Sequence, residues 1–107
     1  MAVLRIEGLP DEPLAAAAAF HANWLPRAQK PSADLVLIFP PADHTHRAWR
    51  LAAVQGLSRE AAPRRVNALA SDDETAIAAA LAYLAGAPGL TGQYFPLDGT
   101  GAGEVIQ

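Results

Sequence analysis

The sequence lacks cysteine and contains a single lysine, Lys30, among its 107 residues. Without cysteine, the chain has no disulfides, no thiol catalysis and no cysteine-based metal site. The other basic residues are scattered arginines, and Arg64-Arg65 is the one adjacent basic pair. A nucleic-acid groove needs clustered positive charge, so we expect no nucleic-acid partner.

Long apolar runs are also missing from the sequence. No run approaches the roughly 20 residues that a membrane-spanning helix needs, so we expect no membrane partner. The first residues, Met1 to Ile6, have neither the basic start nor the small-residue cleavage site of a signal peptide. These features favour a cytoplasmic protein.

The apolar segments that are present alternate between strand-like and helix-like patterns. Short runs bounded by proline or glycine predict four strands, at Val3–Ile6, Ala33–Phe39, Val66–Ala70 and Gln93–Leu97. Helical spacing predicts three helices between them, at Leu14–Leu25, about Thr45–Ala62, and from Ser71 to near Gly86. The order is βαβαβαβ, which predicts an α/β fold with a four-stranded, mostly parallel sheet in one domain of residues 1–107.

Local signals predict how the helices begin and end. Asp11 is expected to cap the first helix, and Pro26 is expected to end it. Ser71 and Glu74 have the spacing of a capping box at the start of the third helix. Gly86 is expected to end that helix in the left-handed conformation.

The strand order also predicts where the helices lie. Consecutive right-handed crossovers between strands added in sequence order place all helices on one face of the sheet. The second face of the apolar middle strands would then need cover, which a partner subunit could provide.

The glycine-rich segment Gly99 to Gly103 follows the last predicted strand. A phosphate-binding loop requires a helix after it, and only four residues remain here. We therefore interpret residues 99–107 as a flexible tail, and we expect no cofactor.

Three short motifs occur in order in the second half of the chain. They are Gly56-Leu57-Ser58-Arg59, Arg65-Val66-Asn67 and Thr91-Gly92-Gln93, the last followed by Asp98-Gly99. Together they resemble the closing part of the short-chain dehydrogenase/reductase family. The resemblance implies a Rossmann-like half-fold that corresponds to the C-terminal half of such an enzyme and lacks its dinucleotide-binding motif.

The resemblance also locates the family's catalytic positions, and this sequence departs from them. The place of the catalytic tyrosine falls at Arg47 and that of the lysine at Leu51. The place of the catalytic serine falls within Phe39-Pro40-Pro41, which has no hydroxyl group. We therefore expect no catalytic residues, and a non-catalytic protein that acts through self-association or through a related full-length partner.

An alternative function depends on a cluster of polar residues. Asp43, His44 and His46 precede or begin the second helix, and Glu7 follows the first strand. Loops at the carboxyl ends of parallel strands are where α/β folds bind ligands, so these four residues could form a polar pocket. The alternative is then a small enzyme or ligand-binding protein. Capping of the second helix by Asp43 or Thr45 could also explain the polarity of this cluster, and we expect no metal site.

Large aromatic side chains on the first two helices suggest either a core or an interface. The candidates for an interface are Phe20, Trp24, Trp49 and Leu57. In the family that the sequence resembles, the matching helices commonly pair with those of another subunit. The default expectation is therefore a homodimer, or a hetero-oligomer with a related full-length protein.

Overall fold

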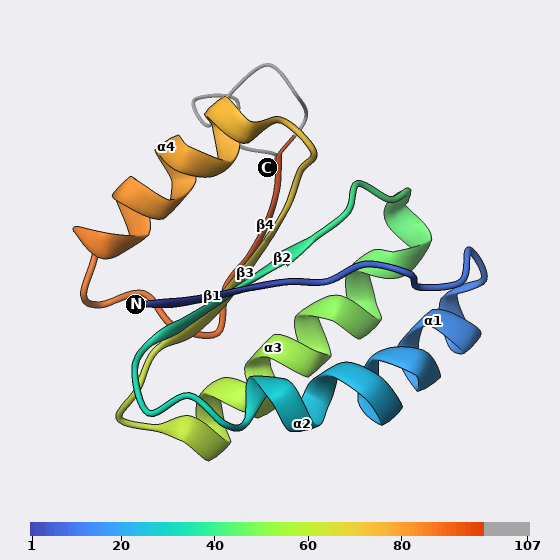
Figure 1. Cartoon of the computed structure of the whole chain (residues 1–107), viewed down its shortest axis with the longest axis horizontal. Coiled ribbons are helices and arrows are strands. Elements are labelled where there is room, and N and C mark those ends of the chain that lie inside the picture. Colours follow the sequence, from blue (N-terminus) through green and yellow to red (C-terminus); the bar gives the residue numbers. More distant parts are fainter. Residues whose placement is uncertain (98–107) are drawn as a thin grey trace.

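The computed structural model describes residues 1–97, so the predicted tail at 99–107 and the Asp98-Gly99 motif lie outside the described residues. Four strands form one parallel sheet in the order β1-β2-β3-β4 (Figure 1). Their bounds are Ala2–Arg5 for β1, Leu35–Phe39 for β2, Val66–Ala70 for β3 and Tyr94–Pro96 for β4. The predicted four-stranded α/β half-fold is confirmed.

Three helical segments connect the strands. The first runs continuously through α1 (Pro13–Ala19), a π-helical turn η1 (Phe20–Trp24) and α2 (Leu25–Ala28). The second combines a 3-10 turn η2 (His44–His46) with α3 (Arg47–Ala61), and the third is α4 (Glu74–Ala85). None of the helices in residues 1–97 has the length and hydrophobicity required to cross a membrane.

Pro26 does not end the first helix, contrary to the prediction. A proline inside an α-helix lacks an N–H and clashes with the carbonyl four residues earlier. Here the preceding turn is widened, and the Leu25 N–H bonds to the Phe20 carbonyl in the i to i−5 pattern of a π-helix. Pro26 therefore stands in the first turn of α2, where a missing N–H costs little.

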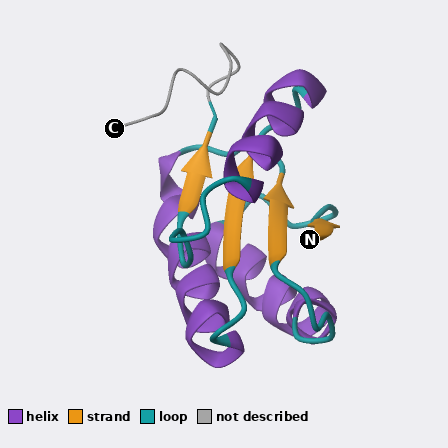
Figure 2. Cartoon of the chain, turned by 90° about the vertical axis from the view of Figure 1, so that its left-hand side faces the viewer, coloured by secondary structure: helices purple, strands orange, loops and turns teal. Residues whose placement is uncertain are grey.

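The two faces of the sheet are covered by different helices of the same chain (Figures 1 and 2). Leu35, Leu37 and Phe39 of β2 share one core cluster with residues of η1, α2 and α3. Val36 and Ile38 of the same strand instead share a second cluster with α4. Side chains alternate across a strand, so these clusters lie on opposite faces.

The prediction that all helices lie on one face is therefore wrong. Because the strands are added in sequence order, a connection whose helix lies on the other face of the sheet has a crossover of the opposite hand. The β3–α4–β4 connection has the opposite hand to the two before it. It departs from the general rule of uniform handedness, and Ile77 and Leu84 of α4 supply the cover that a partner subunit was expected to give.

Three helix-end predictions are corrected by the structure. Glu12, rather than Asp11, caps α1 by accepting from the Leu14 and Ala15 N–H groups, which lowers the Glu12 pKa. Asp73 caps α4 by accepting from the Thr75 N–H at 2.9 Å.

The residues of the predicted capping box have other partners. Ser71 accepts from the Asp73 N–H before the helix begins, and Glu74 pairs with Arg5. Gly86 has a φ of −93°, so it is not left-handed. The predicted signals were placed within two residues of the true ends, but neighbouring carboxylates make the caps.

The amino-terminal edge of the sheet is held together by the family-like motifs. Asn67 of β3 donates to the Leu90 carbonyl at 2.9 Å and accepts from the Gln93 N–H at 3.1 Å. Thr91 Oγ1 accepts from the Val66 N–H at 3.0 Å. Gly92 has a φ of +72°, where a side chain is strained, and a Cβ there would lie 3.0 Å from Ser58 Oγ. The motif residues therefore join β3 to the loop that precedes β4.

Candidate functional site

The carboxyl ends of β1, β2 and β3 surround a shallow hollow of about 260 Å³, which we call the strand-end hollow. Its lining comes from the ends of these strands and the start of α4: Arg5, Ile6, Glu7, Ile38, Phe39, Pro40, Pro41, Ser71, Asp72 and Glu74. Ligands of parallel α/β sheets bind outside the carboxyl ends of the strands. The hollow therefore occupies the place where this class of fold carries its active sites.

A bidentate ion pair closes one side of the strand-end hollow. Arg5 Nη1 and Nη2 donate to the two carboxylate oxygens of Glu74 at 2.8 and 2.9 Å. This hydrogen bonding lowers the Glu74 pKa and raises that of Arg5. Both side chains are more than half exposed, so the pair adds little to folding stability. Three carboxylates against one paired guanidinium make the lining net acidic.

His46 is a structural residue whose ring nitrogens are both occupied. The Trp49 indole N–H donates to His46 Nδ1 at 3.0 Å, so the ring proton must lie on Nε2. His46 Nε2 then donates to the Asp11 carbonyl at 2.9 Å. A buried imidazole with both nitrogens engaged has none left for a metal or a substrate proton.

The four residues of the predicted polar pocket are not brought together. Asp43 caps η2 by accepting from the backbone and side chain of Thr45, which lowers the Asp43 pKa. Of the four candidates, Glu7 alone lines the strand-end hollow, and His44 is exposed outside it. Within residues 1–97, no group of three His, Asp or Glu side chains could hold a metal ion.

The places assigned to the family's catalytic residues lie along α3 and the end of β2. Arg47 is exposed at the first position of α3, and Leu51, one turn later, is half buried against the larger core cluster. Pro40 and Pro41 follow β2 and are exposed. None of these side chains carries a hydroxyl group or an amine.

The sequence analysis missed Arg50, which is 2% exposed. Its Nη1 donates to the Pro40 carbonyl at 2.9 Å and to the Tyr94 hydroxyl at 3.1 Å, and its guanidinium carbon lies 4.6 Å from the centre of the Phe39 ring. A signal was available: Arg50 shares the i, i+3, i+4, i+7 spacing of Ala53, Val54 and Leu57, the buried residues of α3. An arginine on that stripe must be buried.

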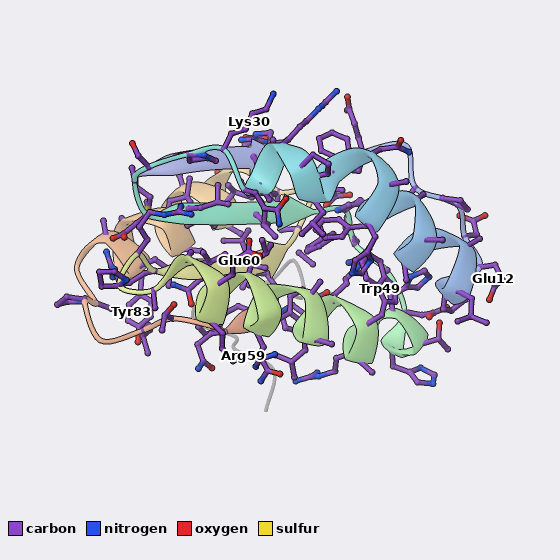
Figure 3. The ribbon with its side chains drawn as sticks, turned by 90° about the horizontal axis from the view of Figure 1, so that it is seen from below. Glu12, Lys30, Trp49, Arg59, Glu60 and Tyr83 are labelled. Carbon is purple, nitrogen blue, oxygen red and sulfur yellow. The ribbon has the colours of Figure 1, made fainter. Side chains whose placement is uncertain are left out.

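A second hollow of about 240 Å³ lies between the first helical segment and α3, and we call it the helix hollow. Its lining is His21, Leu25, Gln29, Ala52, Ala53, Gly56, Leu57 and Glu60. Gln29 Nε2 donates to Glu60 Oε1 at 2.9 Å across one end. Figure 3 shows Glu60 and Trp49 on the side of α3 that faces α1 and α2, with Arg59 on the other side.

The predicted interface residues lie mainly inside the single chain. Phe20 is fully buried and Leu57 is 4% exposed. Trp49 is partly buried and packs between Phe20 and Phe39, with ring centres 5.7 Å from each. Trp24 is partly buried and lies under Arg27. A charged residue at position 49 would disrupt the monomer core, so it cannot report on an interface.

A family model described as short chain dehydrogenase-like protein matches residues 4–97. The chain belongs to this family. No curated protein and no solved structure gives a significant match.

Membership in the short chain dehydrogenase-like family makes sense of the division between the two sheet edges. The Arg65-Val66-Asn67 and Thr91-Gly92-Gln93 motifs contact one another and join β3 to β4. At the other edge, Arg47 and Leu51 occupy α3, and the exposed prolines follow β2. In this chain, the motifs that resemble the family are the ones that join β3 to β4 and so stabilise the fold.

Proposed function

We propose that this short chain dehydrogenase-like protein is non-catalytic and acts by association, by default as a homodimer. The observation that carries the proposal is the chemistry of α3, where Arg47 and Leu51 stand at the places assigned to the catalytic tyrosine and lysine. A guanidinium remains protonated near neutral pH and cannot act as a general acid, and leucine has no group to titrate.

The contact surface we propose is centred on the helix hollow. Ala52 is exposed and Gly56 half exposed on α3, while Leu25 lines the opposite wall. Small residues allow a helix of a second copy to approach closely, and a two-fold axis would bring the same surface of both copies together. Trp24 directly precedes Leu25 on the first helical segment, so we assign Trp24 to the same wall of the proposed contact. Leu57 also lines the helix hollow and belongs to the core cluster that contains Phe20 and packs against Trp49.

The proposal is tested by the mass of the purified protein in solution. Light scattering coupled to size-exclusion chromatography should give twice the chain mass of 11.2 kDa. Ala52→Glu should give the monomer mass, because two like charges would face each other across the axis. Ala79→Glu, an exposed alanine on α4 at the other face of the sheet, should remain dimeric.

A wild-type protein that runs as a monomer at all concentrations would overturn the homodimer. Retention of the dimer in Ala52→Glu would reject the helix hollow as its interface. If the monomer instead captures a full-length relative, the association would be with that protein.

The proposal also predicts that the protein does not bind a dinucleotide. Titration with NAD(H) or NADP(H) in a calorimeter should therefore release no heat. The cytoplasmic location remains a prediction.

A further inference from the structure

Arg50 is the one buried guanidinium for which the described residues provide no carboxylate. Ion pairs within residues 1–97 join Arg5 to Glu74 and Arg65 to Asp34. Arg50, at 2% exposure, has two neutral oxygen partners and the rings of Phe39 and Trp49. Burying a charge is strongly unfavourable unless an opposite charge offsets it. The site is therefore electrostatically incomplete.

The hydrogen bonding of Arg50 is incomplete on one particular side. Both bonds are made by Nη1, whereas Nε is buried and has no partner. Among the described residues it is the single buried side-chain nitrogen or oxygen without one. The Nε–Nη2 side of a guanidinium presents two parallel N–H groups, the arrangement that binds a carboxylate in bidentate fashion.

The surroundings of Arg50 place its guanidinium at the functional edge of the sheet. Its partners are the carbonyl that follows β2 and the hydroxyl of Tyr94 on β4. Phe39 contacts the guanidinium on one side and lines the strand-end hollow on the other. Tyr94 is half exposed and Pro40 is exposed, so the guanidinium lies directly beneath surface residues.

We propose that Arg50 binds a carboxylate-bearing small molecule at the carboxyl edge of the sheet, through the Nε that has no partner among the described residues and the Nη2 beside it. The aromatic packing around the guanidinium favours a flat anion, since a planar carboxylate needs less room than a tetrahedral phosphate. The ligand would supply the missing negative charge. This binding is independent of the association proposed above, which uses the outer surface of α2 and α3.

The test follows the Arg50 Nε–H resonance in the full-length, ¹⁵N-labelled protein. The resonance is assigned by through-bond correlation to the Arg50 backbone. Titration with sodium acetate should move it downfield to a saturating value, because the N–H acquires an anionic acceptor. Sodium chloride at the same ionic strength should leave it in place, and sodium phosphate should move it less than acetate.

Two variants separate binding from general charge effects. Arg50→Lys should lose the saturable response to acetate, since an ammonium has no paired planar N–H groups. Arg47→Lys, at the exposed start of α3, should retain it. If Arg50→Lys does not fold, the wild-type titration alone decides.

Three results would overturn the proposal. The first is an Nε–H that does not respond to acetate, which would make Arg50 purely structural. The second is a response to phosphate that is stronger than the response to acetate. The third is an Nε–H that is already downfield without added anion and moves back in Asp98→Asn, because the chain itself would then provide the carboxylate.

Discussion

An arginine lies at the end of the sheet where the strands begin and another where the strands end, and the two differ in how fully they are bonded. At the amino-terminal edge, Arg65 is held by both oxygens of Asp34, through its backbone N–H and its Nε, each at 2.8 Å. Its Nη1 also donates to the carbonyls of Leu84 and Ala87. At the carboxyl edge, Arg50 is more deeply buried but has no carboxylate within residues 1–97, and its Nε has no partner.

This difference indicates that the amino-terminal edge is the one that stabilises the fold. A fully bonded network removes the cost of burying its polar groups and fixes the geometry of the chain around them. An incomplete one is tolerated where an external group can complete it, as happens at binding sites. The family-like motifs occupy the first kind of edge, and the places that the resemblance assigns to the family's catalytic residues lie near the second.

The strongest test of this comparison is Arg65→Met. Removing the guanidinium leaves Asp34 Oδ2 and two carbonyls without their donor, so we expect a loss of about 3 kcal/mol in the free energy of unfolding. Urea denaturation followed by circular dichroism measures it. Arg5→Met, which breaks the exposed pair with Glu74, serves as the control and should change stability little. Equal losses in both variants would remove the distinction between a half-buried and an exposed ion pair.

A second test addresses the backbone of the amino-terminal edge. Gly92→Ala places a Cβ at a φ of +72° and 3.0 Å from Ser58 Oγ, so we expect a destabilisation of about 2 kcal/mol. Gly56→Ala is the matched control in α3, where the nearest atom to a new Cβ is the flexible Arg59 terminus at 4.0 Å. This variant should be more stable by about 0.5–1 kcal/mol, because alanine favours the helix. A neutral Gly92→Ala would show that the loop adapts freely.

The third test concerns the carboxyl edge. Arg50→Met removes two hydrogen bonds but also removes a buried charge without a carboxylate partner. These effects oppose each other, so we expect a net change within about 1 kcal/mol. The measurement is the same urea titration used for Arg65→Met. A loss as large as that of Arg65→Met would mean that the two edges are equally structural.

The smallest effect should appear in the pH dependence of stability. Hydrogen bonds from the Arg65 backbone and side chain lower the Asp34 pKa in the folded state. The unfolded chain therefore takes up a proton first as pH falls, so this contribution is full above about pH 4 and is lost below it. Urea midpoints between pH 6 and pH 2 should decline more steeply in the wild type than in Asp34→Asn. Identical slopes would contradict the assignment.

Much of the architecture was predictable because strand and helix periodicities differ clearly in this chain. Val66–Ala70 was predicted with the same bounds that the structure gives to β3, and the parallel order followed from alternation. The face covered by α4 was not predictable, because the apolar stripe of a helix does not encode the hand of its crossover. The end of the first helix was not predictable from Pro26, because the preceding π-turn lets the helix continue past the proline.

The candidate site was harder to predict than the fold. Polar residues near strand ends were grouped by their place in the sequence, but their partners are neighbouring backbone groups: His46 donates to Asp11, and Asp43 accepts from Thr45. Arg50 was overlooked since a charged residue on a helix is normally assigned to the solvent side. Its position on the buried stripe was the available clue.

The hydrogen-bond direction of the two outer strands limits how far such sheets could grow by adding further strands. On β1 the N–H groups of Ala2 and, just beyond its end, Ile6 point inward to β2, so those of Val3 and Arg5 face outward and can accept another strand. On β4, the Leu97 N–H bonds inward to Ala70, so Tyr94 and Pro96 face outward, and the proline has no N–H to offer. Among the described residues, the outer side of β1 is therefore the better partner for another strand. Edge pairing between copies is favoured from β1 to β1, and the proline on β4 disfavours its propagation into a fibre.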